Sequence, residues 1–160
     1  MIKNKAYILL FLLIVFHIIN NIVVLKQDLT LINVDSFNYY GTSINLYYDL
    51  IKKTISIKEI ILKNFYYQVV PPVYILTTIP WYFLLGIEQD IACYSNFLYI
   101  IILIVALFLL GRYYSNDYYG VLSAFIVMCY PVVFGLSRWY MSYFASLSMV
   151  TLTVYFLIRK

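Results

Sequence analysis

The sequence predicts an all-helical polytopic membrane protein. The expected architecture is about four transmembrane helices, one short re-entrant or interfacial apolar helix, and an outer loop with two amphipathic surface helices. Of the 160 residues, 64% are hydrophobic and only 11% are charged, whereas soluble domains carry about 25% charged residues. Mean hydropathy is +0.87. The net charge of +4 comes from scattered Lys and Arg residues, so a nucleic-acid partner is not expected, and the lipid bilayer is.

Four segments are apolar and near the length of about 20 residues that crosses a bilayer, namely residues 6–25, 91–110, 120–136 and 140–158. The first exceeds the core of a signal peptide, which is about 7–15 residues long, so we expect a retained signal anchor. A fifth apolar segment, residues 69–86, contains Pro71, Pro72 and Pro80. As a helix it would reach about 25 Å, short of a bilayer core of about 30 Å.

The positions of the basic residues choose between two topologies, because cytoplasmic loops are enriched in Lys and Arg. Lys3 and Lys5 place the N-terminus in the cytoplasm and the first loop outside the cell. If residues 69–86 cross the membrane fully, Arg112, Arg159 and Lys160 lie outside. If they turn back, all three are cytoplasmic. We therefore expect the second arrangement, in an integral protein of the plasma membrane.

The outer loop, residues 26–68, shows helical periodicity. Apolar side chains recur at helical spacing and form one stripe, made of Phe37, Tyr40, Ile44, Tyr47, Tyr48 and Ile51. Ser56 and Glu59 have the S-x-x-E spacing of a capping box, which begins a helix. We expect two short helices on the outer membrane surface with their apolar faces toward the lipid.

Asp35 is the first candidate for chemistry. It follows the first span at the head of the tyrosine-rich segment. A carboxylate at the lipid–water boundary can act as a general base, because partial desolvation raises its pKa toward a useful range. It can equally be the N-cap of a helix that begins near Ser36, which is the commoner role of such a residue.

Three further groups of residues carry two interpretations each. Pro71-Pro72 either holds a loop against a substrate groove or only turns the chain into an apolar helix. Arg138 either pairs with a phosphate or is an anchor in an aromatic belt. Polar side chains on one face of the first span indicate either function or helix–helix hydrogen bonding; these are His17, Asn20 and Asn21.

In their order along the chain, these pieces resemble the N-terminal part of GT-C-type membrane glycosyltransferases. These include the protein O-mannosyltransferases and the lipid A aminoarabinose transferases. The resemblance rests on an acid-to-tyrosine motif after the first span, a Pro-Pro entry to a short segment ending in Gly, an L-G-R end to a span, and a Pro-containing span that ends in S-R. The acid-to-tyrosine motif is Asp35–Tyr39, and the Pro-Pro entry is Pro71–Tyr74, which leads to Leu84–Gly86. The L-G-R end is Leu110–Arg112, and Gly120 opens the next span. That span contains Pro131 and ends at Ser137-Arg138.

The resemblance implies transfer of a sugar from a polyprenyl-phosphate donor to an acceptor on the outer face of the membrane. It implies that Asp35 is the catalytic base, and that Tyr39 and Arg138 bind substrate. It implies no cofactor, and no residue pattern supports a divalent metal.

The chain departs from this family in two motifs and in length. Ser36 stands where the family usually has Glu, and no acid follows Ser137-Arg138 within residues 139–148. The relatives are several hundred residues long, so we expect residues 1–160 to be an N-terminal fragment. On this view the chain is inactive alone and depends on a missing C-terminal part or a partner subunit. The alternative is a non-catalytic scaffold or subunit of a surface-polysaccharide or lipid-linked sugar assembly system.

Overall fold

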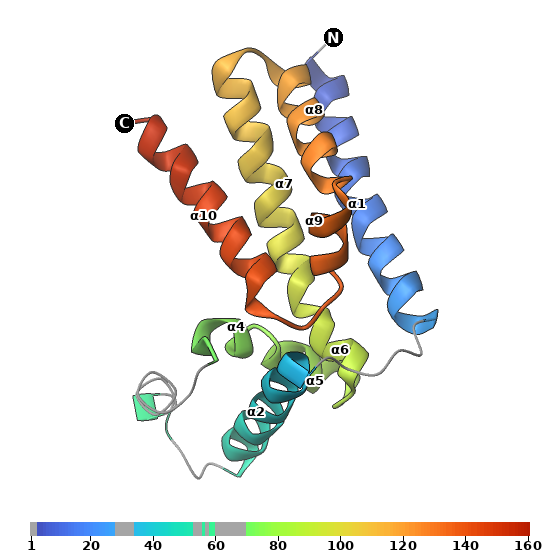
Figure 1. Ribbon diagram of the computed structural model, residues 1–160, viewed down its shortest axis with the longest axis vertical. Helices are drawn as coiled ribbons and strands as arrows, with labels where there is room; N and C mark the ends of the chain where they lie inside the picture. The colour runs from blue at the N-terminus through green and yellow to red at the C-terminus, as the bar shows by residue number, and fades with distance from the viewer. Residues whose placement is uncertain (1–2, 28–33, 53–55, 57, 60–69) are drawn as a thin grey trace. The chain divides into compact units, whose positions relative to one another are not determined.

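The structure is a computed structural model that describes residues 3–27, 34–52, 56, 58–59 and 70–160. Every element in these residues is helical (Figure 1), which confirms the all-helical prediction. The elements are α1 (Lys3–Gln27), α2 (Val34–Ile51), α4 (Pro72–Leu76), α5 (Ile79–Leu85), α6 (Gln89–Cys93), α7 (Ser95–Tyr114), α8 (Asp117–Met128), α9 (Pro131–Leu136) and α10 (Ser142–Ile158).

The described chain forms two compact units. The first unit contains α1, α7 from Asn96 onward, α8, α9 and most of α10. The second unit contains α2, α4, α5, α6 and residues 139–142.

Two helical segments are long and apolar enough to cross a membrane. They are Lys5–Gln27, with 23 residues, and Gln89–Tyr114, with 26. They contain the predicted spans 6–25 and 91–110. Large apolar side chains along α1 are exposed, including Phe11, Phe16 and Ile19, as expected of a helix that meets lipid.

The predicted span 120–136 is not one helix. α8 ends at Met128 after 12 residues, and α9 begins at Pro131 and has six. Proline lacks the backbone N–H that a helix interior needs, and its ring clashes with the preceding turn, so it starts a new helix here. α10 has 17 residues, which is about 26 Å of helix.

The short apolar segment is likewise divided in the residues described from 70 onward. α4 has five residues and α5 has seven, separated by a turn at Thr77 and Thr78. Neither piece has the length of a span.

Contacts at the two ends of the first unit give the directions of its helices. Tyr7, near the start of α1, lies beside Phe108, near the end of α7, with ring centroids 5.6 Å apart. Asn96, at the start of α7, donates a 3.1 Å hydrogen bond to the Ser137 carbonyl, and the Ser137 hydroxyl donates to Asn21 near the end of α1. α1 and α7 are therefore antiparallel (Figure 1).

This antiparallel pairing bears on the two predicted topologies. The chain leaves α1 and enters α7 at the same end of the first unit. A full crossing by residues 69–86 would instead make α1 and α7 run in the same direction. The directions of α1 and α7 are known only within the first unit, so whether residues 69–86 cross the membrane or turn back stays a prediction.

In the second unit, α2 has three faces. Its packed face includes Ser36, Ser43 and Leu46, all at most 7% exposed. A second face is apolar and largely exposed: Phe37 is 63% exposed, and Ile51 is 48% exposed. Half of the predicted apolar stripe is thus exposed and half is partly buried; the exposed residues are Phe37, Tyr48 and Ile51, and the half-buried ones are Tyr40, Ile44 and Tyr47. Tyr47 packs against the rings of Tyr82 and Phe83. The third face is polar and contains Asp35, Asn38, Thr42, Asn45 and Asp49.

The predicted capping box is confirmed at Ser56 and Glu59. The Ser56 N–H donates to the Glu59 carboxylate at 2.8 Å, and the Glu59 N–H donates to the Ser56 hydroxyl at 3.2 Å. The hydrogen bonds from Ser56 lower the pKa of the Glu59 carboxyl. The rest of the helix predicted here, residues 60–68, lies outside the described residues.

Candidate functional site

Asp35 lies in the first turn of α2. Because the helix begins at Val34, Asp35 is inside the helix and not at its N-cap, contrary to the capping interpretation. A negative charge in the first turn still stabilises a helix through the macrodipole. The Asp35 side chain is exposed on the polar face of α2.

Tyr39 is one helical turn after Asp35. At 100° per residue the two side chains project within about 40° of each other, so α2 presents them on one side. The Tyr39 hydroxyl is 2.8 Å from the Ser142 hydroxyl. Its ring lies 5.8 Å from the ring of Tyr74 and 6.2 Å from that of Tyr140. Tyr39 is thus fixed in an aromatic cluster beside the exposed carboxylate.

Buried hydroxyl groups hold the elements of the second unit together around Tyr39. The Thr78 and Tyr140 hydroxyls are 2.7 Å apart, and both residues are almost completely buried. The Ser43 hydroxyl of α2 lies 2.8 Å from the hydroxyl of Tyr82. The Pro71-Pro72 segment begins α4 and brings Tyr74 into this cluster with 2% of its surface exposed. The structure thus shows the turn into a short apolar helix, whereas a loop held against a substrate groove stays a prediction.

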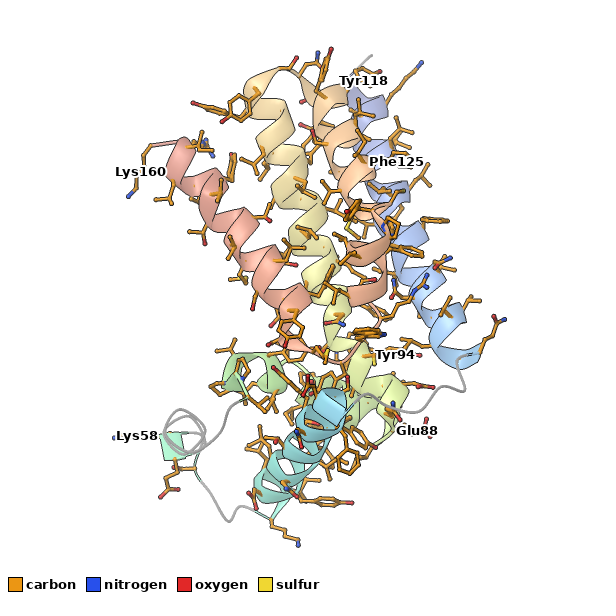
Figure 2. The ribbon with its side chains drawn as sticks, in the orientation of Figure 1. Lys58, Glu88, Tyr94, Tyr118, Phe125 and Lys160 are labelled. Carbon is orange, nitrogen blue, oxygen red and sulfur yellow. The ribbon has the colours of Figure 1, made fainter. Side chains whose placement is uncertain are left out.

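Glu88 is a further carboxylate of the second unit, and it is not among the residues predicted for the site (Figure 2). Burial, followed by the negative charge of Glu88, raises the pKa of Tyr40 on α2. The resemblance to GT-C enzymes predicts a second acid after Ser137-Arg138, where this chain has none. The available signal was the acidic turn between two apolar segments, where Glu88 and Asp90 follow Gly86.

Arg138 is half-buried in the first unit, where it contacts two neighbouring elements. Its Nη2 donates a 2.6 Å hydrogen bond to the Asn20 side-chain oxygen on α1, and its guanidinium carbon lies 3.9 Å from the centre of the Phe134 ring. The Arg138 side chain therefore turns toward α1, and both of its predicted roles, phosphate binding and membrane anchoring, stay predictions. A guanidinium held in this way keeps its charge and a defined orientation, which is what binding of a phosphate requires.

His17, Asn20 and Asn21 join Arg138 in one polar cluster. Asn21 accepts a 3.2 Å hydrogen bond from the Ser137 hydroxyl and donates to the His17 carbonyl at 2.8 Å. His17 is completely buried, and neither of its ring nitrogens has a hydrogen-bond partner in the described structure. The polar face of α1 and the Ser137-Arg138 motif, which were predicted separately, thus contact each other within the first unit.

The three predicted site residues divide between the two units. Asp35 and Tyr39 belong to the second unit, and Arg138 belongs to the first. Among the residues that the structure describes, no three His, Cys, Asp or Glu side chains gather in a way that could hold a metal ion.

Comparisons with known proteins add no family to this description. No family model, no curated protein and no solved structure matches the chain.

Proposed function

We propose that this chain is part of a membrane glycosyltransferase that takes a sugar from a polyprenyl-phosphate donor on the outer face of the membrane. The observation that carries the proposal is the exposed Asp35 carboxylate on the same side of α2 as the packed Tyr39 ring. The ordered motifs that resemble GT-C enzymes support it. So do the two helices long enough to cross a bilayer.

In the proposed reaction, the Asp35 carboxylate accepts the proton of an acceptor hydroxyl. The hydroxyl oxygen then forms a bond to the anomeric carbon of the sugar. The bond from that carbon to the phosphate oxygen breaks, and polyprenyl phosphate leaves with inversion at the anomeric carbon. Tyr39, one helical turn after Asp35 on the same side of α2, contacts the substrate.

The proposed topology has four membrane spans, made by α1, by α6 with α7, by α8 with α9, and by α10. The N-terminus, Arg112 and the Arg159-Lys160 end are cytoplasmic in this topology. The second unit, with Asp35, lies outside the cytoplasm. Positive charge at the end of the first unit where α1 begins supports this orientation.

Sugar transfer in membranes from cells that express the complete native locus tests the proposal. A labelled polyprenyl-phosphate sugar would serve as the donor. We expect Asp35→Asn to lower the transfer rate by about 10²–10⁴-fold, the usual contribution of general-base catalysis. Asp49→Asn, on the polar face of the same helix, is the matched control and should leave the rate unchanged. Equal rates for the wild-type chain and Asp35→Asn would remove Asp35 from the mechanism.

A non-catalytic scaffold or subunit is the second candidate. The engagement of Arg138 with Asn20 and Phe134 favours it, since these contacts also explain the arginine as a structural clamp. This alternative expects a stable complex with a partner membrane protein. It also expects no loss of sugar transfer by that complex in Asp35→Asn.

A further inference from the structure

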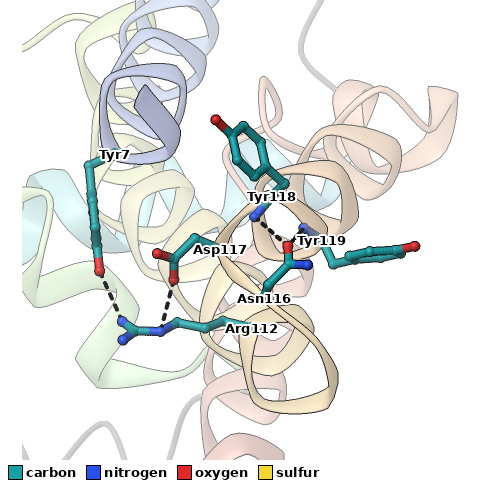
Figure 3. A network of polar contacts seen from close by, with 6 residues as sticks. All are labelled: Tyr7, Arg112, Asn116, Asp117, Tyr118 and Tyr119. Atoms are coloured by element: carbon teal, nitrogen blue, oxygen red, sulfur yellow. Dashed lines mark hydrogen bonds and ion pairs between the residues drawn. The ribbon is translucent and has the colours of Figure 1, made fainter. Parts of the chain in front are cut away.

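Arg112 lies at the turn between α7 and α8 and is held there by two contacts (Figure 3). Its Nη1 donates a 3.0 Å hydrogen bond to the Tyr7 hydroxyl of α1, and its Nε lies 3.0 Å from an Asp117 carboxylate oxygen. The Arg112 side chain nevertheless remains 47% exposed, against 15% for Asp117. Tyr7 and Asp117 therefore fix the orientation of the Arg112 guanidinium, while the Arg112 side chain remains accessible to solvent.

The surface around Arg112 is aromatic and basic. Tyr114 is 72% exposed, and three further tyrosines near the turn are also exposed; they are Tyr113, Tyr118 and Tyr119. α1 begins, and α7 and α10 end, at the same end of the first unit (Figure 1). The described residues near these helix ends include the exposed basic side chains of Lys5, Arg159 and Lys160, and Asp117, the acid beside Arg112, is paired with it.

This combination has the chemistry of a membrane surface. Tyrosine rings are enriched at the boundary between lipid and water, and arginine binds phosphate through its planar set of N–H donors. Arg112 lies in the last turn of α7, which belongs to one of the two segments long enough to cross a bilayer. Its partner Tyr7 lies on the other. A turn that follows such a helix reaches the level at which phospholipid headgroups lie.

We propose that Arg112 at the α7–α8 turn binds the phosphate of an anionic phospholipid headgroup. The exposed tyrosines flank the headgroup, and Lys5, Arg159 and Lys160 add attraction for its charge. Tyr7 and Asp117 position the guanidinium. The site does not depend on the proposed sugar transfer and can be tested without it.

Substitutions of Asp117 and of Arg112 are expected to change the affinity for an anionic lipid in opposite directions. Its carboxylate competes with a phosphate for the guanidinium. Asp117→Asn should therefore strengthen binding of an anionic lipid, whereas Arg112→Gln should weaken it. A salt bridge that serves only stability would not produce opposite changes in lipid affinity.

Native mass spectrometry of the full chain in detergent, titrated with phosphatidylglycerol or phosphatidylcholine, measures this affinity directly. We expect Arg112→Gln to weaken phosphatidylglycerol binding about fivefold, the usual effect of one basic residue at an anionic membrane. We expect Asp117→Asn to strengthen it, and neither variant to change the weak binding of phosphatidylcholine. Lys52→Gln, just after the end of α2, is the matched control for the loss of one exposed positive charge and should have no effect.

Thermal unfolding of the same samples, and a parallel titration with inorganic phosphate, separate the alternatives. Unchanged phosphatidylglycerol binding in both variants would overturn the proposal. So would parallel weakening in both that follows a loss of thermal stability, since that result describes a structural ion pair. Displacement of the lipid by inorganic phosphate at millimolar concentration would overturn the lipid assignment in favour of a soluble phosphate ligand.

Discussion

Gly120 and Gly111 allow α7 and α8 to approach closely at the turn that joins them. A Cβ atom built on Gly120 would lie 2.5 Å from the Phe108 carbonyl oxygen and 2.7 Å from a carbon of the Phe108 ring. One built on Gly111 would lie 2.6 Å from the Ser123 hydroxyl and 2.7 Å from the Tyr119 carbonyl oxygen. The Gly120 contact is with the backbone of the neighbouring helix, so no side-chain rotation can relieve it.

We predict that Gly120→Ala destabilises the first unit. Separating two packed helices to admit one methyl group costs about 1–3 kcal/mol. The higher helix propensity of alanine returns about 1 kcal/mol, which leaves a net loss of up to about 2 kcal/mol. Gly41→Ala in α2 is the matched control, because nothing lies within 4 Å of its added Cβ. Gly41→Ala should therefore gain only the stability that comes from the higher helix propensity of alanine, about 1 kcal/mol.

The difference between the two variants isolates the steric cost, since the propensity term is common to both. Unfolding of the purified chain in detergent by increasing fractions of sodium dodecyl sulfate, followed by circular dichroism, measures both free energies. We expect Gly41→Ala to exceed Gly120→Ala in stability by about 1–3 kcal/mol. Equal stability of the two variants would refute the close approach of α7 and α8.

Two further predictions concern the second unit. Thr78→Val keeps the shape of the side chain but leaves the buried Tyr140 hydroxyl without that hydrogen bond, so the free energy of unfolding in the same titration should fall by about 1–3 kcal/mol; an unchanged value would contradict the hydroxyl network. The pKa of Tyr40 is raised in the folded state, so the folded protein holds the phenolic proton of Tyr40 more tightly than the unfolded chain does. The free energy of unfolding should therefore be unchanged below about pH 10 and should fall as the pH rises further. Thermal unfolding at increasing pH should show a smaller fall in Glu88→Gln, and an identical fall would exclude Glu88 as a cause.

Some of the structure was predictable because its signals are local. The capping box needs only Ser56 and Glu59 at the right spacing. The spans 6–25 and 91–110 need only apolar runs of sufficient length. The break at Pro131 was also visible in the sequence, but the average hydropathy of residues 120–136 concealed it.

The candidate site was less predictable because its geometry depends on long-range contacts. Asp35 and Tyr39 share one side of α2 by helical periodicity alone, which the sequence supplies. The hydrogen bond from Arg138 to Asn20 joins residues 118 positions apart, and no periodicity reports it. Glu88 has a local signal in the acidic turn after Gly86, but only the fold shows that its charge acts on Tyr40.

The proposed topology is tested most directly by finding the sides of the membrane on which α2 and the α7–α8 turn lie. Single cysteines introduced by Asn45→Cys on α2 and Ser115→Cys at the α7–α8 turn would be placed in a chain whose native Cys93 and Cys129 are replaced by alanine. The account predicts that a membrane-impermeant maleimide labels Asn45→Cys in intact cells and labels Ser115→Cys only after permeabilisation. Labelling of both positions from the same side of the membrane would contradict the topology and, with it, the placement of Asp35 outside the cytoplasm.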